Sequence, residues 1–318
     1  MMTSILDIQR VREVPGIATL YTASRATDPD LWFEFLDAVD PGTPRERKWV
    51  IMVSTQFGCA VGCPMCDVGT IGYNGNLATE EMLSQIRFAL SAHPETNPAE
   101  VPKLKVHFAR MGEPSLNPAV LKCIEHLGRA ARLPGLMPSL STVAPRCGVV
   151  RDFFSELSVL KDRYFGAGRF QLQFSVHSTD EEARRALIPV RKWGLEEIAA
   201  FGARWWRPGD RRITLNFALA EGIPCSPDVV ERHFSPERFL LKFTPIHPTE
   251  RADRNKLTRV WFETPEGIAR VTGELERRGF RTIVNPAWPE EVFGSVSCGQ
   301  LAGSALRAER AKAREAVC

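Results

Sequence analysis

The chain has 318 residues, which at about 150 residues per domain corresponds to two domains or one large one. Apolar residues make up 44% and charged residues 25%, a globular composition that excludes a disordered, collagenous or coiled-coil chain. The net charge of +3 neither requires nor excludes a nucleic-acid partner. No apolar run reaches the roughly 18 residues of a membrane helix. The first residues also lack the pattern of a signal peptide, so we expect a cytoplasmic protein without a membrane partner.

Residues 1–46 are predicted to be irregular, with one strand-like stretch at 31–35 and a turn after it. From residue 47 onward, strand and helix patterns alternate. Strands are predicted at 48–55, 104–109, 139–142, 170–177, 213–220, 239–246 and 280–284. Helices are predicted near 79–91, 117–133, 153–160, 180–187, 195–206 and 264–279, with a short one between 220 and 239 and a frayed one at 304–317. Asn117 and Pro118 suit a helix start, and Gly279 suits a helix end.

The order of these elements predicts the fold class. Six strands each precede a helix and a seventh strand follows, which indicates an α/β protein with a parallel sheet, open or closed into a barrel. We divide the chain into an N-terminal extension (1–46), a barrel (47–286) and a C-terminal segment (287–318). In such folds the chemistry lies at the carboxyl ends of the strands. A glycine-rich loop at 56–76 begins where the first of these strands ends.

Three of the eight cysteines lie on this loop, in the pattern Cys59-x3-Cys63-x2-Cys66. Thiolates bind soft metals and iron–sulfur clusters. Three thiolates can hold three corners of a [4Fe–4S] cube and leave the fourth iron open. A structural zinc site normally has four ligands, and the next histidine in the chain is His93. We therefore rank a cluster above zinc, and either above three unrelated core cysteines.

This cysteine pattern at the end of a first strand resembles the radical S-adenosylmethionine (SAM) superfamily. Five motif segments also follow one another as in the RlmN/Cfr family of adenine-C2 and adenine-C8 RNA methyltransferases: 54–77, 110–117, 139–142, 174–190 and 297–303. The resemblance covers about residues 48–303, and the pairing of Gly-Glu-Pro with a late Cys-Gly-Gln-Leu is its most specific part. It implies a partial (β/α)6 barrel, a [4Fe–4S] cluster on the three cysteines, SAM at the open iron, and an electron donor such as flavodoxin or ferredoxin.

The resemblance also implies which residues contact SAM. They are Gly112, Glu113, Ser141, Ser175, His177 and His247. Of these, His247 stands where the family has an asparagine, and one of its ring nitrogens could make the same contact. Taken without the resemblance, Glu113 would be a solvated turn acid and His177 a structural histidine.

Cys298 carries the most distinctive chemistry that the resemblance implies. Its thiolate takes a methyl group from one SAM, and a second SAM supplies a 5′-deoxyadenosyl radical that abstracts hydrogen from the S-methyl group. The resulting methylene radical adds to an unactivated carbon, which polar methylation cannot reach. A thiolate is a suitable nucleophile for the first step. The alternative is an ordinary free cysteine.

The sequence departs from the family at the thiol that releases the product. The family has this cysteine seven residues before the first cluster cysteine, and here Met52 stands there. A thioether cannot perform thiol–disulfide exchange. Cys225 and Cys147 are candidates by position, although each is more simply an inert structural cysteine. Cys123 is expected in the core, and Cys318 is terminal.

A second departure concerns the N-terminal region. Residues 1–47 are too few for the accessory domain that helps the family hold RNA. The family also has a glutamate there as a proton acceptor. Glu34 is the nearest candidate, although its alignment needs an insertion, and its alternative is a solvent-facing strand acid.

Four functional hypotheses follow. The first is a radical SAM C-methyltransferase that acts on a small heteroaromatic or nucleoside-like molecule, favoured over RNA as partner. For this molecule, Trp205, Trp206 and Trp288 are candidates to stack a base. The second keeps RNA, held by four arginines that are interleaved with Trp205 and Trp206: Arg204, Arg207, Arg211 and Arg212. The alternative for that stretch is a solvated helix end and core packing. The third is hydrogen abstraction with Cys298 idle, and the fourth is a non-enzymatic iron–sulfur or zinc protein.

Overall fold

The computed structural model describes residues 5–130, 133–220, 223–257, 265–285, 289–297 and 299–302. Within these ranges ten strands form one sheet, in the order β1-β2-β3-β4-β7-β8-β9-β10-β11-β12, and β5 pairs with β6 as a separate hairpin. The strands are β1 (Leu6–Val14), β2 (Ala18–Arg25), β3 (Asp28–Ala38), β4 (Trp49–Val53), β5 (Gln56–Gly58), β6 (Tyr73–Asn76), β7 (Leu104–Phe108), β8 (Leu136–Thr142), β9 (Gln171–Ser175), β10 (Ile213–Leu219), β11 (Phe239–Pro245) and β12 (Arg281–Val284). The helices are α1 (Thr79–Ser91), α2 (Ala119–Arg129), α3 (Gly148–Tyr164), α4 (Glu181–Leu187), α5 (Leu195–Trp205), α6 (Pro227–His233), α7 (Glu250–Arg254), α8 (Pro265–Arg277) and α9 (Pro289–Phe293), with 3-10 turns at Asp67–Thr70 and Pro114–Leu116.

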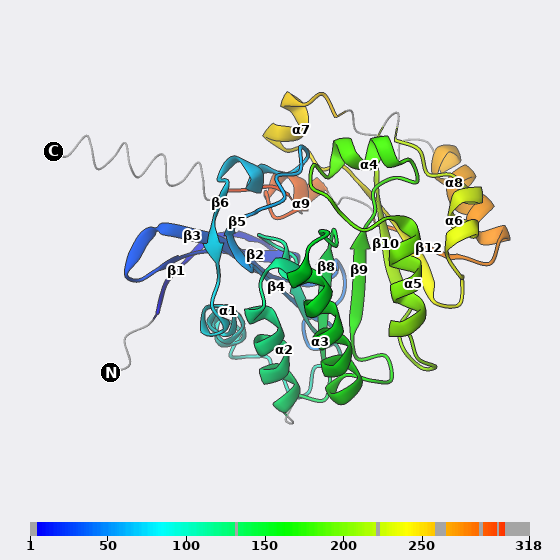
Figure 1. The fold of residues 1–318 in the computed structure, drawn as a ribbon. Coiled ribbons are helices and arrows are strands. Elements are labelled where there is room, and N and C mark those ends of the chain that lie inside the picture. The colour runs from blue at the N-terminus through cyan, green and yellow to red at the C-terminus, as the bar shows by residue number, and fades with distance from the viewer. Residues whose placement is uncertain are drawn as a thin grey trace.

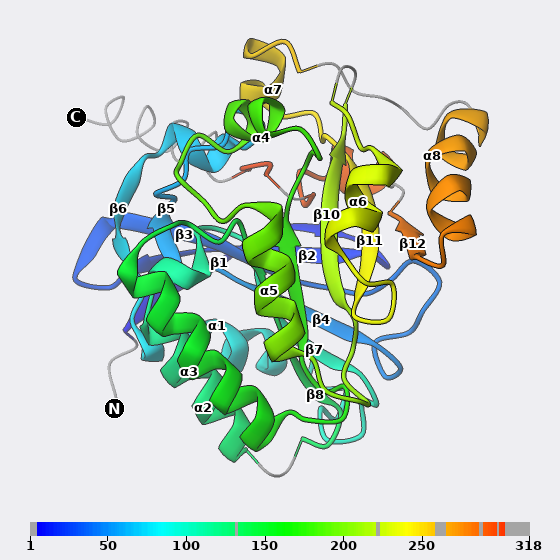
Figure 2. The same cartoon turned by 45° about the vertical axis from the view of Figure 1, so that its right-hand side comes forward.

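In the described part of the chain, β4 and β7 to β12 run parallel to one another. Each of these strands is followed along the chain by a helix, which after β12 is the five-residue α9. Helices α1, α2 and α3 lie side by side on the outer face of the sheet, and α5, α6 and α8 continue this layer (Figures 1 and 2). The predicted alternation of strands and helices is confirmed, and the architecture is a partial (β/α)6 barrel.

The two faces of the barrel strands differ in polarity. In β4 the side chains of Trp49, Ile51 and Val53 are fully buried toward the helices. Because side chains alternate along a strand, residues between such positions face the inside of the curved sheet. In β9 these are Gln171 and Gln173, which are only partly buried. Full burial of one large apolar side chain contributes about 1.5–3 kcal/mol to folding, so the outer face holds the sheet together and the inner face is free for polar groups.

The N-terminal residues form strands, which corrects the prediction of an irregular extension. The stretch 31–35 lies within β3, and β1, β2 and β3 pair antiparallel and continue the sheet beyond β4. A β-bulge between Arg10 and Arg12 shifts the register of β1. A bulge breaks the alternation of apolar and polar residues. The pattern of β1 was therefore not recognisable from a period of two.

Local signals placed the start of α2 and the end of α8 within two residues. Before α2, Pro118 already has helical backbone angles, and the side-chain oxygen of Asn117 accepts from the N–H of Ala119 at 3.0 Å, which is the predicted capping bond. The side chain of Asn117 also ties the helix start to the loops after β4 and β6, because its amide donates to the carbonyl oxygens of Thr55 at 2.7 Å and Leu77 at 2.8 Å. The predicted helix end at Gly279 is confirmed by its φ of +85°. The glycine-rich loop 56–76 also contains the β5–β6 hairpin, which was not predicted.

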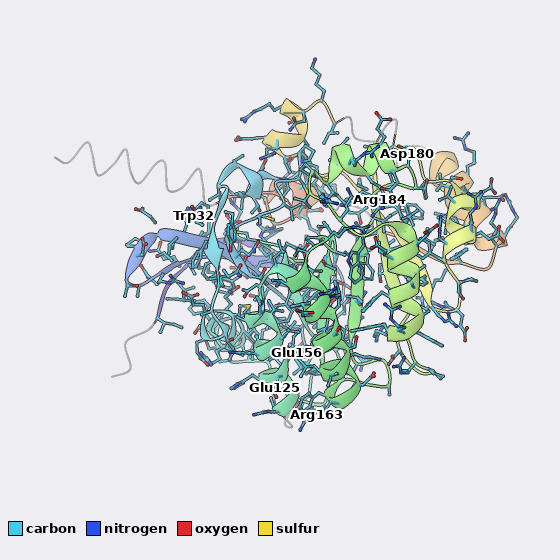
Figure 3. The ribbon with its side chains drawn as sticks, viewed as in Figure 1. Trp32, Glu125, Glu156, Arg163, Asp180 and Arg184 are labelled. Carbon is cyan, nitrogen blue, oxygen red and sulfur yellow. The ribbon has the colours of Figure 1, made fainter. Side chains whose placement is uncertain are left out.

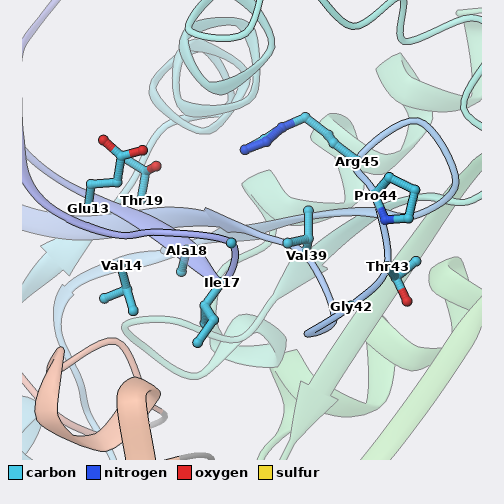
Figure 4. Close-up of a pocket in the computed structure, with 11 residues that line it drawn as sticks. Glu13, Val14, Ile17, Ala18, Thr19, Val39, Gly42, Thr43, Pro44 and Arg45 are labelled. Atoms are coloured by element: carbon cyan, nitrogen blue, oxygen red, sulfur yellow. The ribbon is translucent and has the colours of Figure 1, made fainter.

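A pocket of about 480 Å³ lies between the β1–β2 turn and the loop that joins β3 to β4 (Figure 4). Its lining comes from residues 13–19 and 39–45 and includes none of the predicted site residues. The loop between β3 and β4 precedes β4, so this pocket adjoins the edge of the sheet opposite the cysteine loop. None of the described helices combines the length and the apolar character that a membrane span requires.

Candidate active site

The predicted site residues converge on the edge of the sheet formed by the carboxyl ends of the parallel strands. The cysteine loop follows β4 and β5, Glu113 follows β7, His177 follows β9 and His247 follows β11. Ser141 lies near the end of β8. In sheets of this class, ligands bind outside the carboxyl ends of the strands.

The cysteine loop begins at a close backbone crossing. Gly58 has a φ of +80°, and a Cβ atom at this position would lie 1.8 Å from the carbonyl oxygen of Gly72. The backbone N–H of Cys59 donates to the same carbonyl at 2.8 Å. Farther along, the N–H of Cys66 donates to the carbonyl of Cys63 at 3.2 Å and closes a turn. Only glycine fits at position 58, so the first cysteine is placed by the residue before it.

The segment around α7 holds the loop from one side. The guanidinium of Arg251 donates to the carbonyl of Gly62 at 3.1 Å, and its backbone N–H donates to the carboxylate of Asp67 at 3.0 Å. The hydroxyl of Thr249 donates to the carbonyl of Met65 at 3.0 Å. Sequence analysis did not identify α7, because five residues are too few to show a helical period.

The donor set of the loop fits a cluster. Among the described residues, no three His, Cys, Asp or Glu side chains converge as closely as a single metal ion requires. A [4Fe–4S] cube instead takes one thiolate at each of several separate irons. Cys59, Cys63 and Cys66 are each partly buried. Burial raises the pKa of Cys59 and raises that of Cys63 to about 12, and the negative charge of Glu113 adds to both shifts. Binding of iron therefore has to displace protons from these thiols.

Donors surround the carboxylate of Glu113, which is buried. Its Oε1 accepts from the hydroxyls of Ser115 at 2.6 Å and Thr142 at 2.5 Å, and its Oε2 accepts from the N–H of Val143 at 2.9 Å. These bonds join the end of β7 to the end of β8. These bonds fix the side chain of Glu113, and the SAM contact that the resemblance implies for Gly112 and Glu113 stays a prediction.

We expect Thr142→Val to destabilise the protein by about 1–3 kcal/mol, because it removes a donor from a buried carboxylate while keeping the shape of the side chain. The same hydroxyl also accepts from the N–H of Ala144 at 2.8 Å, and this bond would be lost as well. Urea unfolding measures the effect, with Thr27→Val at an exposed turn position as the control. Equal unfolding free energies for both variants would contradict the importance of this network.

His177 has an unusual conformation and a nitrogen that is available for a ligand. Its φ is +65°, a left-handed value that is costly for a residue with a side chain. Its Nδ1 is buried and has no hydrogen-bond partner within the described ranges. Burial lowers the pKa of His177 to about 4, and the charges of Arg184 and Lys192 contribute. Figure 3 shows Arg184 and Asp180 at the start of α4, on the same side of the molecule as α7. A neutral ring with an unpartnered nitrogen fits the predicted contact with SAM.

Ser141 belongs to a polar network on the inner face of the sheet. Its Oγ lies 2.8 Å from Nε2 of His107 and accepts from the amide of Gln173 at 3.0 Å. Burial lowers the pKa of His107, so its ring is neutral. Ser175 is partly buried and pairs in register with Asn216 of β10. Both predicted serines therefore lie among polar groups of this face, which also carries Lys105 and Lys242.

His247 is buried, with 8% of its surface exposed, and follows the end of β11. The next residue, Pro248, accepts through its carbonyl from the amide of Gln300 at 3.0 Å. The predicted replacement for the family asparagine therefore stands beside the contact that joins the loop after β11 to the C-terminal segment.

Three residues singled out from the sequence lie outside the described ranges: Cys298, Cys318 and Trp288. The residue after the predicted carrier, Gly299, is described and contacts the cysteine loop. Its carbonyl accepts from the N–H of Asp67 at 2.8 Å, and a Cβ atom at Gly299 would lie 3.6 Å from Cα of Cys66. The chain next to Cys298 is therefore held against the loop that carries the cluster cysteines.

Glu34 lies in β3 and is completely buried, so the alternative of a solvent-facing strand acid is wrong. Its carboxylate pairs with the guanidinium of Arg110 at 2.7 Å. Sequence analysis missed Arg110, because an arginine beside a Gly-Glu-Pro motif carries no local signal of a buried partner.

Met52 packs near the C-terminal segment. It lies beside a small apolar cluster that includes Leu20, Leu36, Val296 and Ala302. Val296 and Ala302 are on either side of Cys298 in the sequence. Met52, which stands where the family has its product-releasing cysteine, thus packs against the cluster that contains Val296 and Ala302.

The other described cysteines lie outside that cluster. Cys225 packs against the main core, and burial raises its pKa to about 12. Cys147 is exposed at the start of α3. Cys123 is fully buried on α2, which confirms the prediction that it belongs to the core.

The arginine-rich stretch lies at the opposite end of the sheet. Arg211 and Arg212 immediately precede β10, and their guanidinium groups donate to the carbonyls of Gly168 at 2.8 Å and Glu237 at 3.2 Å. Trp205 is buried. Arg211 and Arg212 therefore close loops and Trp205 fills the core, as the alternative of core packing expected, and RNA binding by this stretch stays a prediction.

The chain is similar in sequence to proteins named RNA methyltransferases. No model of a protein family matches the chain. A probable dual-specificity RNA methyltransferase RlmN of Thermus thermophilus is 28% identical over 273 residues, which cover 81% of this chain and 69% of that protein. The dual-specificity RNA methyltransferase RlmN of Marinobacter nauticus is 25% identical over 312 residues, which cover 93% of this chain and 79% of that protein.

The fold also matches a solved structure. The crystal structure of a radical SAM methyltransferase from Sphaerobacter thermophilus aligns with a TM-score of 0.74 at 22% identity, over 93% of this chain and 81% of that one. The named relatives, the shared fold and the cysteine loop agree on an enzyme that uses a [4Fe–4S] cluster and SAM. The chain is thus similar to the RlmN/Cfr-like radical SAM methyltransferases in sequence and in fold.

Proposed function

We propose that the chain transfers a one-carbon unit from SAM, through the thiol of Cys298, to an unactivated carbon of a small heteroaromatic or nucleoside-like molecule. The observation that carries this proposal is the hydrogen bond of 2.8 Å from the N–H of Asp67 to the carbonyl of Gly299. It holds the residue after Cys298 against the cysteine loop. When bound, the cluster supplies one electron to SAM, and SAM supplies both the carbon unit and the means of hydrogen abstraction. The protein's own part is to present a thiol that accepts the methyl group and to hold the substrate beside it.

The inner face of the sheet supports a heteroaromatic substrate. Gln173, Ser141 and Asn216 project there, and the hydroxyl of Thr244 donates to the side-chain oxygen of Asn216 at 3.0 Å. Amides and hydroxyls both donate and accept, and so they can pair with ring nitrogens and exocyclic amines. The arginine-rich stretch, the basic feature that favoured RNA in the sequence, lies at the other edge of the sheet.

RNA is the second candidate substrate, because the relatives are named RNA methyltransferases. On this reading the same polar face would hold one adenine of a larger RNA. We expect flavodoxin or ferredoxin to serve as the electron donor in either case, in a reducing cytoplasm.

Label transfer from SAM distinguishes the two substrates. The reconstituted enzyme is incubated anaerobically with methyl-deuterated SAM, a reductant, and either the small-molecule fraction of a cell extract or a ribosomal RNA transcript. We expect deuterium in a small heteroaromatic product, detected by mass spectrometry. Deuterium found only in the transcript would show that the substrate is RNA and would contradict the proposed small molecule. A Cys298 that never carries label in either reaction would contradict the carrier.

A further inference from the structure

One buried arginine fixes the segment that carries Cys298. Arg110 follows β7, and only 2% of its side chain is exposed. Its Nη1 donates to the carbonyls of Val296 at 3.2 Å and Ser297 at 2.9 Å, and its Nη2 donates to the carbonyl of Gln300 at 3.0 Å. Carbonyl groups from both sides of Cys298 therefore converge on one guanidinium, whose planar donors have a fixed geometry.

A carboxylate completes this arrangement. Oε2 of Glu34 accepts from Nη2 of Arg110 at 2.7 Å, and Oε1 accepts from the backbone N–H of Ala302 at 2.9 Å. Glu34 thus binds both the arginine and the far end of the same segment. Charge-assisted bonds of this kind are the stronger ones in proteins, and a pair that is enclosed in this way is rigid.

The same segment is anchored by apolar contacts and by the loop after β11. Val296 and Ala302 pack with Leu20 and Leu36 on the inner side of β2 and β3. The side-chain amide of Gln300 donates to the carbonyls of Pro248 at 3.0 Å and Val292 at 3.1 Å. These contacts place the segment in the fold, and the paired charges fix the backbone on both sides of position 298.

We propose that Arg110 and Glu34 form a positioning latch that holds the backbone on both sides of Cys298 against the cysteine loop. This inference rests on the proposed role of Cys298 as the carrier. A methyl group passes between two sulfur atoms only when they are close and in line, and a misplacement of about 1 Å can slow a reaction by about a hundredfold. Arg110 is a positioning residue, since it acts on the carbonyl groups around the carrier.

In this proposal Glu34 acts through Arg110 and through its own bond to the N–H of Ala302, which the amide oxygen of Glu34→Gln can still accept. The resemblance gives Glu34 the role of a proton acceptor, whereas here its two oxygens face a guanidinium and a backbone N–H. The two roles predict different coupling between substitutions. If Glu34 works only through the latch, Glu34→Gln combined with Arg110→Met loses no more activity than Arg110→Met alone. If Glu34 also takes a proton, the double variant is slower still and its pH profile changes.

The test uses reconstituted holoenzyme of Arg110→Met, Arg110→Lys and the control Arg211→Met, whose arginine also donates to a carbonyl but at the opposite edge. Methylation of Cys298 is followed by intact mass, SAM cleavage by 5′-deoxyadenosine, and mobility by hydrogen exchange of residues 289–302. For Arg110→Met we expect methylation about a hundredfold slower, faster exchange in this segment, and wild-type iron content and SAM cleavage. Arg110→Lys should recover only part of the rate, because an ammonium cannot reach the same set of acceptors.

The outcomes separate the latch from the proposed function. Unchanged exchange in both Arg110 variants would overturn the latch, whatever happens to methylation. A parallel loss of iron, SAM cleavage and methylation would show a general structural role and would also overturn it. If wild-type Cys298 never carries a methyl group, the proposed function fails, while the exchange data still decide whether the segment is latched. Should Arg110→Met not fold, Glu34→Gln gives the same exchange measurement.

Discussion

Replacement of Gly58 by alanine is expected to abolish cluster assembly. The new Cβ atom would lie 1.8 Å from the carbonyl oxygen and 2.8 Å from the carbonyl carbon of Gly72, distances that no stable contact allows. Because both atoms are backbone, no side-chain rotation relieves the overlap. The β5–β6 hairpin has to separate, and the bond from the N–H of Cys59 to the same carbonyl is lost with it. Cys59 then moves away from Cys63 and Cys66, so the three thiols no longer lie close enough together to hold one cluster.

Gly62→Ala is the matched control for this prediction. Gly62 lies on the same loop with a similar φ of +68°, but a Cβ atom there would meet no atom within 4 Å. Its cost is therefore limited to the left-handed backbone, about 1–2 kcal/mol. Iron and sulfide are measured after anaerobic reconstitution, together with visible absorption. We expect near-normal iron in Gly62→Ala and almost none in Gly58→Ala. Equal iron content in Gly58→Ala and the wild type would contradict the claim that the close approach of Gly58 to Gly72 places Cys59.

The barrel could be predicted because its signals are local. In β9 the alternation of Gln171, Leu172, Gln173 and Phe174 is visible in the sequence, and it matches the two faces of the sheet. In β1 the bulge at Arg10 and Arg12 breaks that alternation, so this strand was not predicted. Periodicity fails where the backbone itself leaves the regular period.

The candidate site likewise contains residues that the sequence identifies and residues that it does not. Cys59, Cys63 and Cys66 were identified from their spacing within one loop, because a metal site of this kind is written in a short stretch of chain. The latch is not. Arg110 and Glu34 are 76 positions apart, and Glu34 and Ala302 are 268 apart. Nothing in the chain near any of the three marks it as a partner. Long-range pairs of this kind become visible only when the fold brings them together.

Cys298→Ala is expected to reduce methyl transfer to background and leave SAM cleavage intact. The thiolate is the only part of the side chain that can accept the methyl group, and alanine has no nucleophile. Cleavage persists because the contact of this region with the cysteine loop is made by the carbonyl of Gly299, which the substitution retains. Product and 5′-deoxyadenosine are measured in the same reaction, so the two activities are compared directly.

Cys147→Ala is the control for this experiment, because Cys147 is exposed at the start of α3. It should match the wild type in both readouts. Turnover that survives in Cys298→Ala would leave Cys298 idle and favour an enzyme that only abstracts hydrogen.

Cys225→Ala then tests how the product is released. Met52 cannot perform thiol–disulfide exchange, and burial raises the pKa of Cys225 to about 12, which makes it a poor nucleophile at neutral pH. We therefore expect Cys225→Ala to turn over normally, so that release proceeds without a second cysteine. Accumulation of a substrate adduct on Cys298 in this variant alone would instead identify Cys225 as the releasing thiol, and would require the segment around it to move toward position 298 during turnover.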